Sequence, residues 1–262
     1  MNKTTNMLKN TLKLCIPHGI YEVLKKNNRK YEPQRNIIYR GILELIDTEK
    51  SLTELIGDDW KISPYYDIVE NDLRLWWDEN SIFYRRFQEL DCRKIVELAC
   101  GHGRHVQRYL SVPETIYLVD INQENINFCK NRYANETKIQ YVVNDGTNFI
   151  VIDSSSQTAI FTYDAMIHFE MFDIIKYLKD ANRILVNGGK ILFHHSNAAY
   201  NPELFYRYKP LGRNFLSADI FAYVALRSGF KIISQDIFSW EWDKNDTKDI
   251  DCLSLCQKVK GI

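Results

Sequence analysis

The stretch Lys94-Ile-Val-Glu-Leu-Ala-Cys-Gly-His-Gly-Arg-His-Val106 decides the fold of this chain. It begins as a short apolar run typical of a buried strand, passes through two glycines and continues into a helical pattern. Glycine carries no Cβ, so the backbone at Gly101 and Gly103 can approach a ligand closely. A strand, a glycine turn and a helix in this order predict a ligand site at the carboxyl edge of a parallel sheet.

The sequence around this stretch predicts a sheet of seven strands. After residue 90, β-rich runs alternate with helical stretches, which is the pattern of a parallel sheet covered by helices. The predicted strands are Lys94–Ala99, Ile116–Asp120, Ile139–Val143, Thr158–Tyr163, Lys190–His194, Lys231–Trp240 and Cys252–Lys258. No convincing helix separates the last two, so we expect them to pair as an antiparallel hairpin. The predicted fold class is α/β, a Rossmann-like, doubly wound sheet.

Three helices are predicted between the strands. They cover Gln123–Ala134, Phe172–Leu185 and Ala218–Ser228. Asn187-Gly188-Gly189 is expected to end the second, because glycine adopts the left-handed conformation of helix caps at little cost. Before residue 90, apolar residues recur at helical spacing. We therefore predict two parts: a helical N-terminal cap over residues 1–90 and a sheet domain over residues 91–262.

Composition narrows the class of protein. Lys plus Arg equals Asp plus Glu at 34 each, which gives no support for nucleic acid as a partner. None of the six cysteines forms a CxxC pair or has zinc-finger spacing, and no apolar run approaches the roughly 20 residues of a membrane span. The expectation is a reduced, cytoplasmic protein. The basic amphipathic stretch Leu8–Lys26 suits contact with a membrane surface or with a second subunit of a homo-oligomer, or a solvated helix.

Two ligands compete for the glycine turn. A dinucleotide site requires a third glycine where this chain has Val106. The alternative pattern is an acidic residue followed by a small-x-Gly-x-Gly loop, which Glu97, Ala99, Gly101 and Gly103 match. On these residues the chain resembles the class I S-adenosylmethionine-dependent methyltransferases, with Ala99 in place of the commoner first glycine. The resemblance implies S-adenosylmethionine as cofactor and S-adenosylhomocysteine as product.

The ends of the next strands agree with this resemblance. Asp120 and Ile121 end the second strand, and a carboxylate there can accept both hydrogen bonds of a ribose diol, although NAD would be held in the same way. After the third strand, Asp145 and Gly146 occupy the place where the family commonly has a carboxylate near the adenine amino group; Asn-Asp-Gly is also a good turn sequence. Tyr163 ends the fourth strand, where the acceptor side of the family begins. It is a candidate cofactor-binding residue, as are Ile121 and Gly146.

Histidines after the fourth and fifth strands are the candidate catalysts. A hydroxyl acceptor must lose a proton, and histidine is the usual base near neutral pH. His168 and His195 are the candidate bases, and since neighbouring strand residues face opposite ways, at most one of His194 and His195 is expected to reach the pocket. Candidate acceptor-binding residues are Trp76, Trp77, Asp164, His194, Asn197, Tyr200 and Arg213. Trp76 and Trp77, together with Tyr65 and Tyr66, are expected to form a lid or, alternatively, a packed brace on the sheet.

The segments Tyr163–Phe169 and His194–Asn197 resemble those of methyltransferases found with bacterial surface-glycan genes. That resemblance implies O-methylation of a small-molecule acceptor, a sugar or a phosphorylated or nucleotide-linked precursor. Three other functions stay open. They are a metal-assisted O-methyltransferase, for which Asp164 and His168 offer two ligands and no third, an NAD-linked oxidoreductase, and an S-adenosylmethionine-binding protein without catalysis.

Overall fold

The computed structural model describes residues 51–61, 63–71, 73–200, 212–239 and 248–259. Contacts between residues group Leu52–Ile262 into one compact unit. Most of the predicted N-terminal cap, including Leu8–Lys26, lies outside the described residues. None of the described helices is long and apolar enough to cross a membrane.

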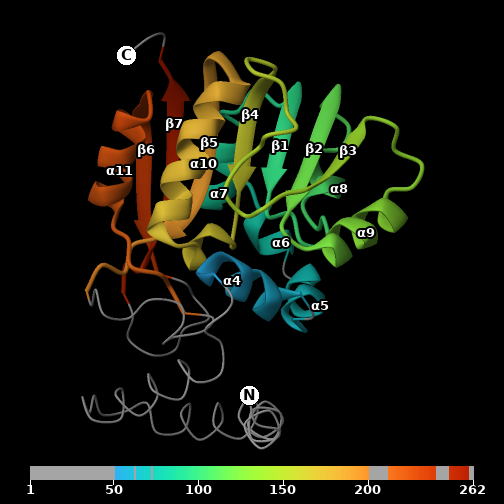
Figure 1. The fold of residues 1–262 in the computed structure, drawn as a ribbon, viewed down its shortest axis with the longest axis horizontal. Coiled ribbons are helices and arrows are strands. Elements are labelled where there is room, and N and C mark those ends of the chain that lie inside the picture. The colour runs from blue at the N-terminus through green and yellow to red at the C-terminus, as the bar shows by residue number, and fades with distance from the viewer. Residues whose placement is uncertain (1–50, 62, 72, 201–211, 240–247, 260–262) are drawn as a thin grey trace, which may run out of the picture. The chain divides into compact units, whose positions relative to one another are not determined.

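All seven predicted strands are present and form one sheet. They are β1 (Lys94–Leu98), β2 (Thr115–Asp120), β3 (Ile139–Val143), β4 (Gln157–Thr162), β5 (Leu185–Ser196), β6 (Phe230–Phe238) and β7 (Asp251–Lys258). Their order is β3-β2-β1-β4-β5-β7-β6, with β7 antiparallel to both neighbours (Figure 1). The predicted fold class is confirmed, including the antiparallel pair that closes it. The order reverses between β1 and β4, and ligands bind at the carboxyl ends of the strands at such a switch point.

Helices cover both faces of the sheet (Figure 1). The described ones are α4 (Leu52–Trp60), α5 (Tyr65–Glu70), α6 (Leu73–Trp76), α7 (Ile82–Phe87), α8 (Val106–Tyr109), α9 (Gln123–Arg132), α10 (Met171–Ile184) and α11 (Ala218–Arg227). One hydrophobic cluster joins α6–α9 to the sheet, and a second joins α10 and α11 to the opposite face. The five described cysteines are buried and free of disulfides, as small apolar residues in these clusters.

The predicted end of α10 is wrong. The helix stops at Ile184, and Leu185 is already extended at φ −73° and ψ 144°. Gly188 and Gly189 lie inside β5, where the register runs from Leu185 opposite Gln157 to Lys190 opposite Ala159. The extra residues form a bulge, and Gly188 takes the φ of +81° that the bulge requires. The two glycines therefore serve the strand and not the helix cap.

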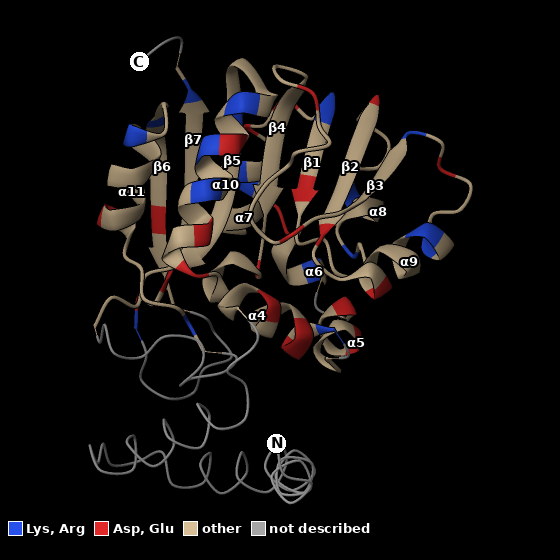
Figure 2. Ribbon diagram, viewed as in Figure 1, with Lys and Arg blue, Asp and Glu red and all other residues tan. Residues whose placement is uncertain are grey.

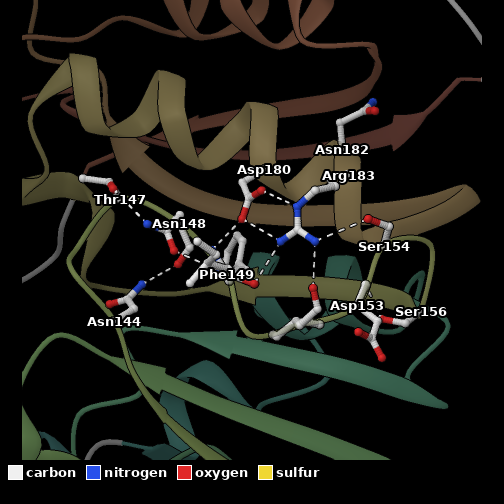
Figure 3. Close-up of polar contacts among 12 residues, drawn as sticks. Asn144, Thr147, Asn148, Phe149, Asp153, Ser154, Ser156, Asp180, Asn182 and Arg183 are labelled. Atoms are coloured by element: carbon white, nitrogen blue, oxygen red, sulfur yellow. Dashed lines mark hydrogen bonds and ion pairs between the residues drawn. The ribbon is translucent and has the colours of Figure 1, made fainter.

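The connection between β3 and β4 is fastened to α10 by hydrogen bonds from its backbone to an ion pair within that helix, Arg183 with Asp180 (Figure 3). Arg183 donates from Nε to Asp180 Oδ1 at 2.6 Å. The same guanidinium donates to the carbonyl oxygens of Ile152 at 2.8 Å and Phe149 at 3.0 Å. Asp180 Oδ2 in turn accepts from the Phe149 backbone N–H at 2.6 Å. This clamp holds the segment that begins at Asn144, directly after β3.

Replacing Arg183 by alanine is expected to lower the free energy of unfolding by about 1–2 kcal/mol, because two backbone carbonyls lose their donor. Urea unfolding followed by circular dichroism measures the change. Arg93→Ala is the matched control, since Arg93 pairs only with Asp91 on the exposed surface, where ion pairs contribute little. Equal unfolding curves for the two variants would show that the clamp does not stabilise the domain.

Candidate cofactor and acceptor site

A single pocket lies at the carboxyl ends of β1, β2 and β4. It encloses about 1020 Å³ of space free of atoms, including the open solvent at its mouth. Four groups of residues line it: α4 and α5 with Thr53, Ile56, Gly57, Trp60, Tyr65, Tyr66 and Glu70; the glycine turn with Glu97–His102, Arg104 and His105; the ends of β2 and β3 with Asp120–Asn122, Asn144 and Gly146; and the segment after β4 with Tyr163–Ala165, His168, Phe169, Asp173 and Tyr177.

The glycine turn needs its glycines. Ala99, Gly101 and Gly103 have φ angles of 54°, 52° and 68°, in the left-handed region. A Cβ on Gly101 would lie 2.5 Å from the Tyr66 ring, and one on Gly103 would lie 3.0 Å from Cys129 Sγ. Ala99 adopts the same conformation with its Cβ in place, at a cost of about 1–2 kcal/mol. Gly101 therefore lines the pocket with the Tyr66 ring packed closely against it, whereas Gly103 packs against Cys129 and Tyr133 and does not line the pocket.

Asp120 is buried beneath the turn. Its Oδ2 accepts from the Gly101 backbone N–H at 2.9 Å, and its Oδ1 accepts from the backbone of Asn122 at 2.9 Å and from the side chain of Asn125 at 3.1 Å. Burial raises the pKa of Asp120 although these bonds oppose the shift. A carboxylate offers about four lone-pair sites, so three bonds leave room for one more donor. In this arrangement Asp120 can hold one ribose hydroxyl, where the sequence suggested two.

The other cofactor candidates divide between the pocket and its surroundings. Glu97 lines the pocket and accepts from Tyr109 Oη at 2.7 Å, and burial raises its pKa to about 8. Ile121, Gly146 and Tyr163 also line the pocket. Asp145 does not, because its carboxylate accepts from Thr147 and Asn148 in its own turn. For Asp145 the turn interpretation of the sequence is the one that the geometry supports.

Helices α4 and α5 cover the pocket and are tied to the sheet domain. The Tyr66 ring stacks on His102 with centroids 4.3 Å apart, and its hydroxyl accepts from Asn125 at 3.1 Å. Asn122 donates to the carbonyl of Gly57 in α4 at 2.8 Å. The predicted aromatic lid thus consists of Tyr65 and Tyr66 with Trp60. Trp60, the last residue of α4, was not predicted from the sequence, although it belongs to the same aromatic-rich segment before β1 as the two tyrosines.

Trp76 and Trp77 belong to the packed brace and not to the pocket lining. Trp77 packs edge-on against Phe83 and Phe87 and donates to His105 Nδ1 at 3.1 Å. Trp76 is buried, with the Arg104 guanidinium 4.7 Å from its ring centroid. The two tryptophans therefore stabilise residues of the glycine turn from behind.

Asp164 stands at the opposite end of the pocket from Asp120 in a left-handed conformation, with φ of 61°. Its Oδ2 accepts from Tyr65 Oη and from the Arg104 guanidinium, the latter at 3.0 Å. Its backbone N–H donates to His194 Nδ1 at 3.0 Å, so His194 supports Asp164 from the strand behind it. Within the described part of the chain, no group of three or more His, Cys, Asp and Glu side chains is arranged to hold a metal ion.

His168 lines the pocket beside Trp60, with ring centroids 4.8 Å apart. Its Nδ1 lies 2.8 Å from the carbonyl oxygen of Gly212. A carbonyl only accepts, so Nδ1 carries the proton and Nε2 is the nitrogen that can receive one. Burial lowers the pKa of His168 to about 4, which keeps the imidazole neutral at pH 7.

His195 lies on the other face of the sheet. Its ring stacks on Phe221 of α11 with centroids 4.0 Å apart. Nδ1 lies 2.8 Å from the carbonyl of Ser196, and Nε2 lies 2.8 Å from Ser254 Oγ. The structure thus brings His168 and Asp164 into the pocket, with His194 directly behind Asp164, and leaves His195 out.

His195 makes the stability of the fold depend on pH. Burial lowers the pKa of His195 from the ordinary 6.5 to about 3. Between these two pH values His195 is therefore protonated in the unfolded chain and neutral in the folded chain. Stability is therefore complete above pH 6.5 and falls as the pH decreases toward 3. We expect His195→Gln to reduce the loss between pH 7 and pH 4 by about 2–4 kcal/mol in urea titrations. Parallel pH profiles for the variant and the wild type would contradict this account.

The remaining acceptor candidates lie outside the pocket lining. Arg213 donates to both carboxylate oxygens of Asp251, at 3.0 Å and 2.8 Å. Asn197 accepts from the backbone of Ala218 and donates to the carbonyl of Asp249, so it holds the start of α11. Tyr200 is exposed. Arg104 and Asn144, which do line the pocket, were missed because an arginine and an asparagine in a turn carry no distinctive spacing.

Comparison with known proteins agrees with this geometry. Residues 95–189 match the family model described as a methyltransferase domain. A curated relative is the fatty-acid O-methyltransferase of Mycolicibacterium smegmatis, 27% identical over 119 residues, which are 44% of this chain and 42% of that protein. The match thus spans less than half the length of the relative.

Solved structures share the fold. An S-adenosylmethionine-dependent methyltransferase from Mesorhizobium loti superposes with a TM-score of 0.55 at 15% identity, over 67% of this chain and 97% of that one. The cyclase SpnF superposes with a TM-score of 0.57 at 11% identity, over 77% of this chain and 84% of that one. The two names show that this fold carries more than one chemistry.

Proposed function

We propose that this chain is a class I methyltransferase that transfers the methyl group of S-adenosylmethionine to an oxygen of a small-molecule acceptor. Residues 95–189 match the family model described as a methyltransferase domain, which supports the proposal. S-adenosylhomocysteine is then the second product. The observation that carries the proposal is the shared pocket. The glycine turn and Asp120 line one end of it, and His168 and Asp164 line the other.

The residues of the pocket fit the cofactor. The left-handed turn brings the Gly101 backbone to the pocket, where a Cβ would collide with Tyr66, and Asp120 retains capacity for one hydroxyl. Ile121 and Gly146 supply an apolar wall beside the end of β2. Five carboxyl-bearing residues line the pocket, and the negative charge of the ionised ones suits a cationic sulfonium.

In the proposed mechanism the sulfonium supplies an electrophilic methyl carbon, and the protein aligns an acceptor oxygen with it. Alignment of this kind accounts for much of the rate of a displacement reaction. His168 receives the acceptor proton at Nε2, with its tautomer held by the Gly212 carbonyl. Helices α4 and α5 cover the reaction and exclude water through Trp60, Tyr65 and Tyr66.

We further propose a sugar-like acceptor. Trp60 and Tyr65 offer apolar ring faces, while carboxylates beside them accept hydroxyl hydrogens. Two arginines that could bind a phosphate are engaged by internal carboxylates, Arg104 of the pocket lining by Asp164 and the candidate Arg213 by Asp251. This pairing supports a neutral acceptor more than a phosphorylated one.

Calorimetric titration with S-adenosylmethionine, S-adenosylhomocysteine and NAD tests the cofactor assignment. We expect micromolar binding of both adenosyl ligands and none of NAD. Binding of NAD alone would contradict the proposed cofactor and favour the alternative of an NAD-linked oxidoreductase. Cofactor binding without methyl transfer to any component of a low-molecular-weight cell extract would favour the alternative of a binding protein without catalysis.

A further inference from the structure

We propose that Asp164 binds a hydroxyl of the acceptor next to the one that is methylated, so that the enzyme makes methyl ethers of neutral polyols and not methyl esters of carboxylates. This inference rests on the proposed function and specifies its substrate class. It differs from the activity named for the curated relative, whose acceptor is a fatty acid.

The first observation is how the Asp164 carboxylate is used. Tyr65 and Arg104 both donate to Oδ2. Among the described residues no donor reaches Oδ1, although Asp164 lines the pocket and its side chain is only 4% exposed. A carboxylate accepts and never donates while ionised, so Oδ1 calls for an O–H or N–H from the ligand.

The second observation is that Asp164 is held in place from three sides. Its backbone has a left-handed φ of 61°, which costs a non-glycine residue energy and persists only where the surroundings enforce it. The ion pair with Arg104 and the hydrogen bond from Tyr65 fix the carboxylate, and His194 fixes the backbone N–H. Such rigid placement of a hydrogen-bonding group is what selection between ligands requires.

The third observation is the charge of the pocket. Its described lining carries five carboxyl groups, those of Glu70, Glu97, Asp120, Asp164 and Asp173, against a single guanidinium, that of Arg104. Glu97, whose pKa burial raises to about 8, is mostly protonated at pH 7, so the negative charge comes from the other four. The lining histidines are kept neutral, because burial lowers the pKa values of His102, His105 and His168. Figure 2 shows acidic positions on β1, β2, α4 and α5 at the same end of the sheet.

These observations together select the acceptor. A carboxylate substrate would bring a negative charge next to Asp164 at a site shielded from water, where like charges strongly disfavour binding. A polyol instead supplies one hydroxyl to Asp164 Oδ1 and presents its neighbour to the methyl carbon. The new O–C bond then forms as the C–S bond breaks, the electron pair stays on sulfur, and the proton of the reacting hydroxyl goes to His168 Nε2.

The type of bond formed can be read without knowing the acceptor in advance. Wild-type protein is incubated with S-adenosylmethionine labelled with ¹³C in the methyl group and with a low-molecular-weight extract of the source cells. Carbon NMR separates ether, ester and N-methyl products. We expect the label in ethers. Label in esters overturns this inference and leaves the proposed O-methyl transfer intact. Label in N-methyl groups overturns both the inference and the oxygen acceptor of the proposed function. Absence of label in any product, with the cofactor bound, overturns the proposed function and this inference with it.

Once the labelled product has identified the acceptor, variants of Asp164 are assayed with that acceptor. Asp164→Asn keeps the shape and removes the charge, and we expect a 10- to 100-fold fall in kcat/KM, mostly through KM, with cofactor affinity within about threefold. Asp236→Asn is the matched control, because Asp236 lies on β6, outside the pocket, and pairs with Arg86 of α7. Unchanged kcat/KM for Asp164→Asn overturns the assignment, and if that variant does not fold, the NMR result on the wild type still decides the substrate class.

Discussion

Replacing His168 by alanine is expected to lower kcat by about 10²- to 10⁴-fold, the usual contribution of a general base. The reason lies in the tautomer. The Gly212 carbonyl fixes the proton on Nδ1, so Nε2 is the basic nitrogen, and burial keeps the ring neutral at pH 7 with a pKa of about 4. The rate of S-adenosylhomocysteine formation under saturating substrate measures the effect, with cofactor affinity checked by calorimetry.

The control for His168→Ala is His195→Gln. His168 follows β4 and His195 lies near the end of β5 in the same sheet. His195 packs against Phe221 and Ser254 on the far face, so its variant should keep the wild-type kcat. Because free His168 has a low pKa, activity should persist down to about pH 5 before it declines. Full turnover by His168→Ala would mean that another group, with Asp164 the nearest candidate, accepts the proton.

The fold was predictable because its signals are periodic and repeated. Each strand is an apolar run bounded by turn residues, and the glycine turn after β1 marks the edge where ligands bind. The end of α10 was not predictable in the same way. Gly188 and Gly189 suit a helix cap as well as a bulge, and only the pairing of β5 with β4 decides between the two.

The site was predictable at the strand ends and less so around them. Glu97, Gly101, Asp120 and His168 all line the pocket. Between His194 and His195 the alternation of a strand predicts that one faces the pocket side and leaves open which. The choice depends on the register of β5 against β7, where His194 pairs with Leu253 and His195 with Cys252.

The aromatic residues before β1 show a second limit of sequence reasoning. Tyr65, Tyr66, Trp76 and Trp77 are equally suited to a lid or to a core, since each has an apolar ring and a polar tip. The structure places Tyr66 on the glycine turn and Tyr65 on Asp164. Trp77 packs against α7, and Trp76 packs against His105 and Tyr163. The directions in which these aromatic side chains point are set by short helices with turns between them. Hydrophobic periodicity does not extend across such turns, so it does not predict those directions.

Replacing Asp120 by asparagine is expected to weaken S-adenosylmethionine binding by about 10- to 100-fold, the value of one hydrogen bond to a charged group. Asp145→Asn provides the comparison, because Asp145 bonds only within its own turn and its variant should bind as the wild type does. Calorimetry on both variants measures the difference. Equal losses for the two would mean that the ligand draws Asp145 into the pocket.

Two routes lead from Asp120 to the cofactor, and they predict different results with a modified ligand. Asp120 can accept one ribose hydroxyl directly, and it also holds the glycine turn through the Gly101 N–H. If the direct contact dominates, S-adenosylhomocysteine lacking the 2′- and 3′-hydroxyls should bind the wild type and Asp120→Asn equally. If the turn dominates, the variant should lose the same factor with both ligands, because the backbone at Gly101 contributes whether or not the hydroxyls are present. Since Oδ1 is already shared by Asn122 and Asn125, we expect the loss to divide between the two routes, with part of it surviving removal of the hydroxyls.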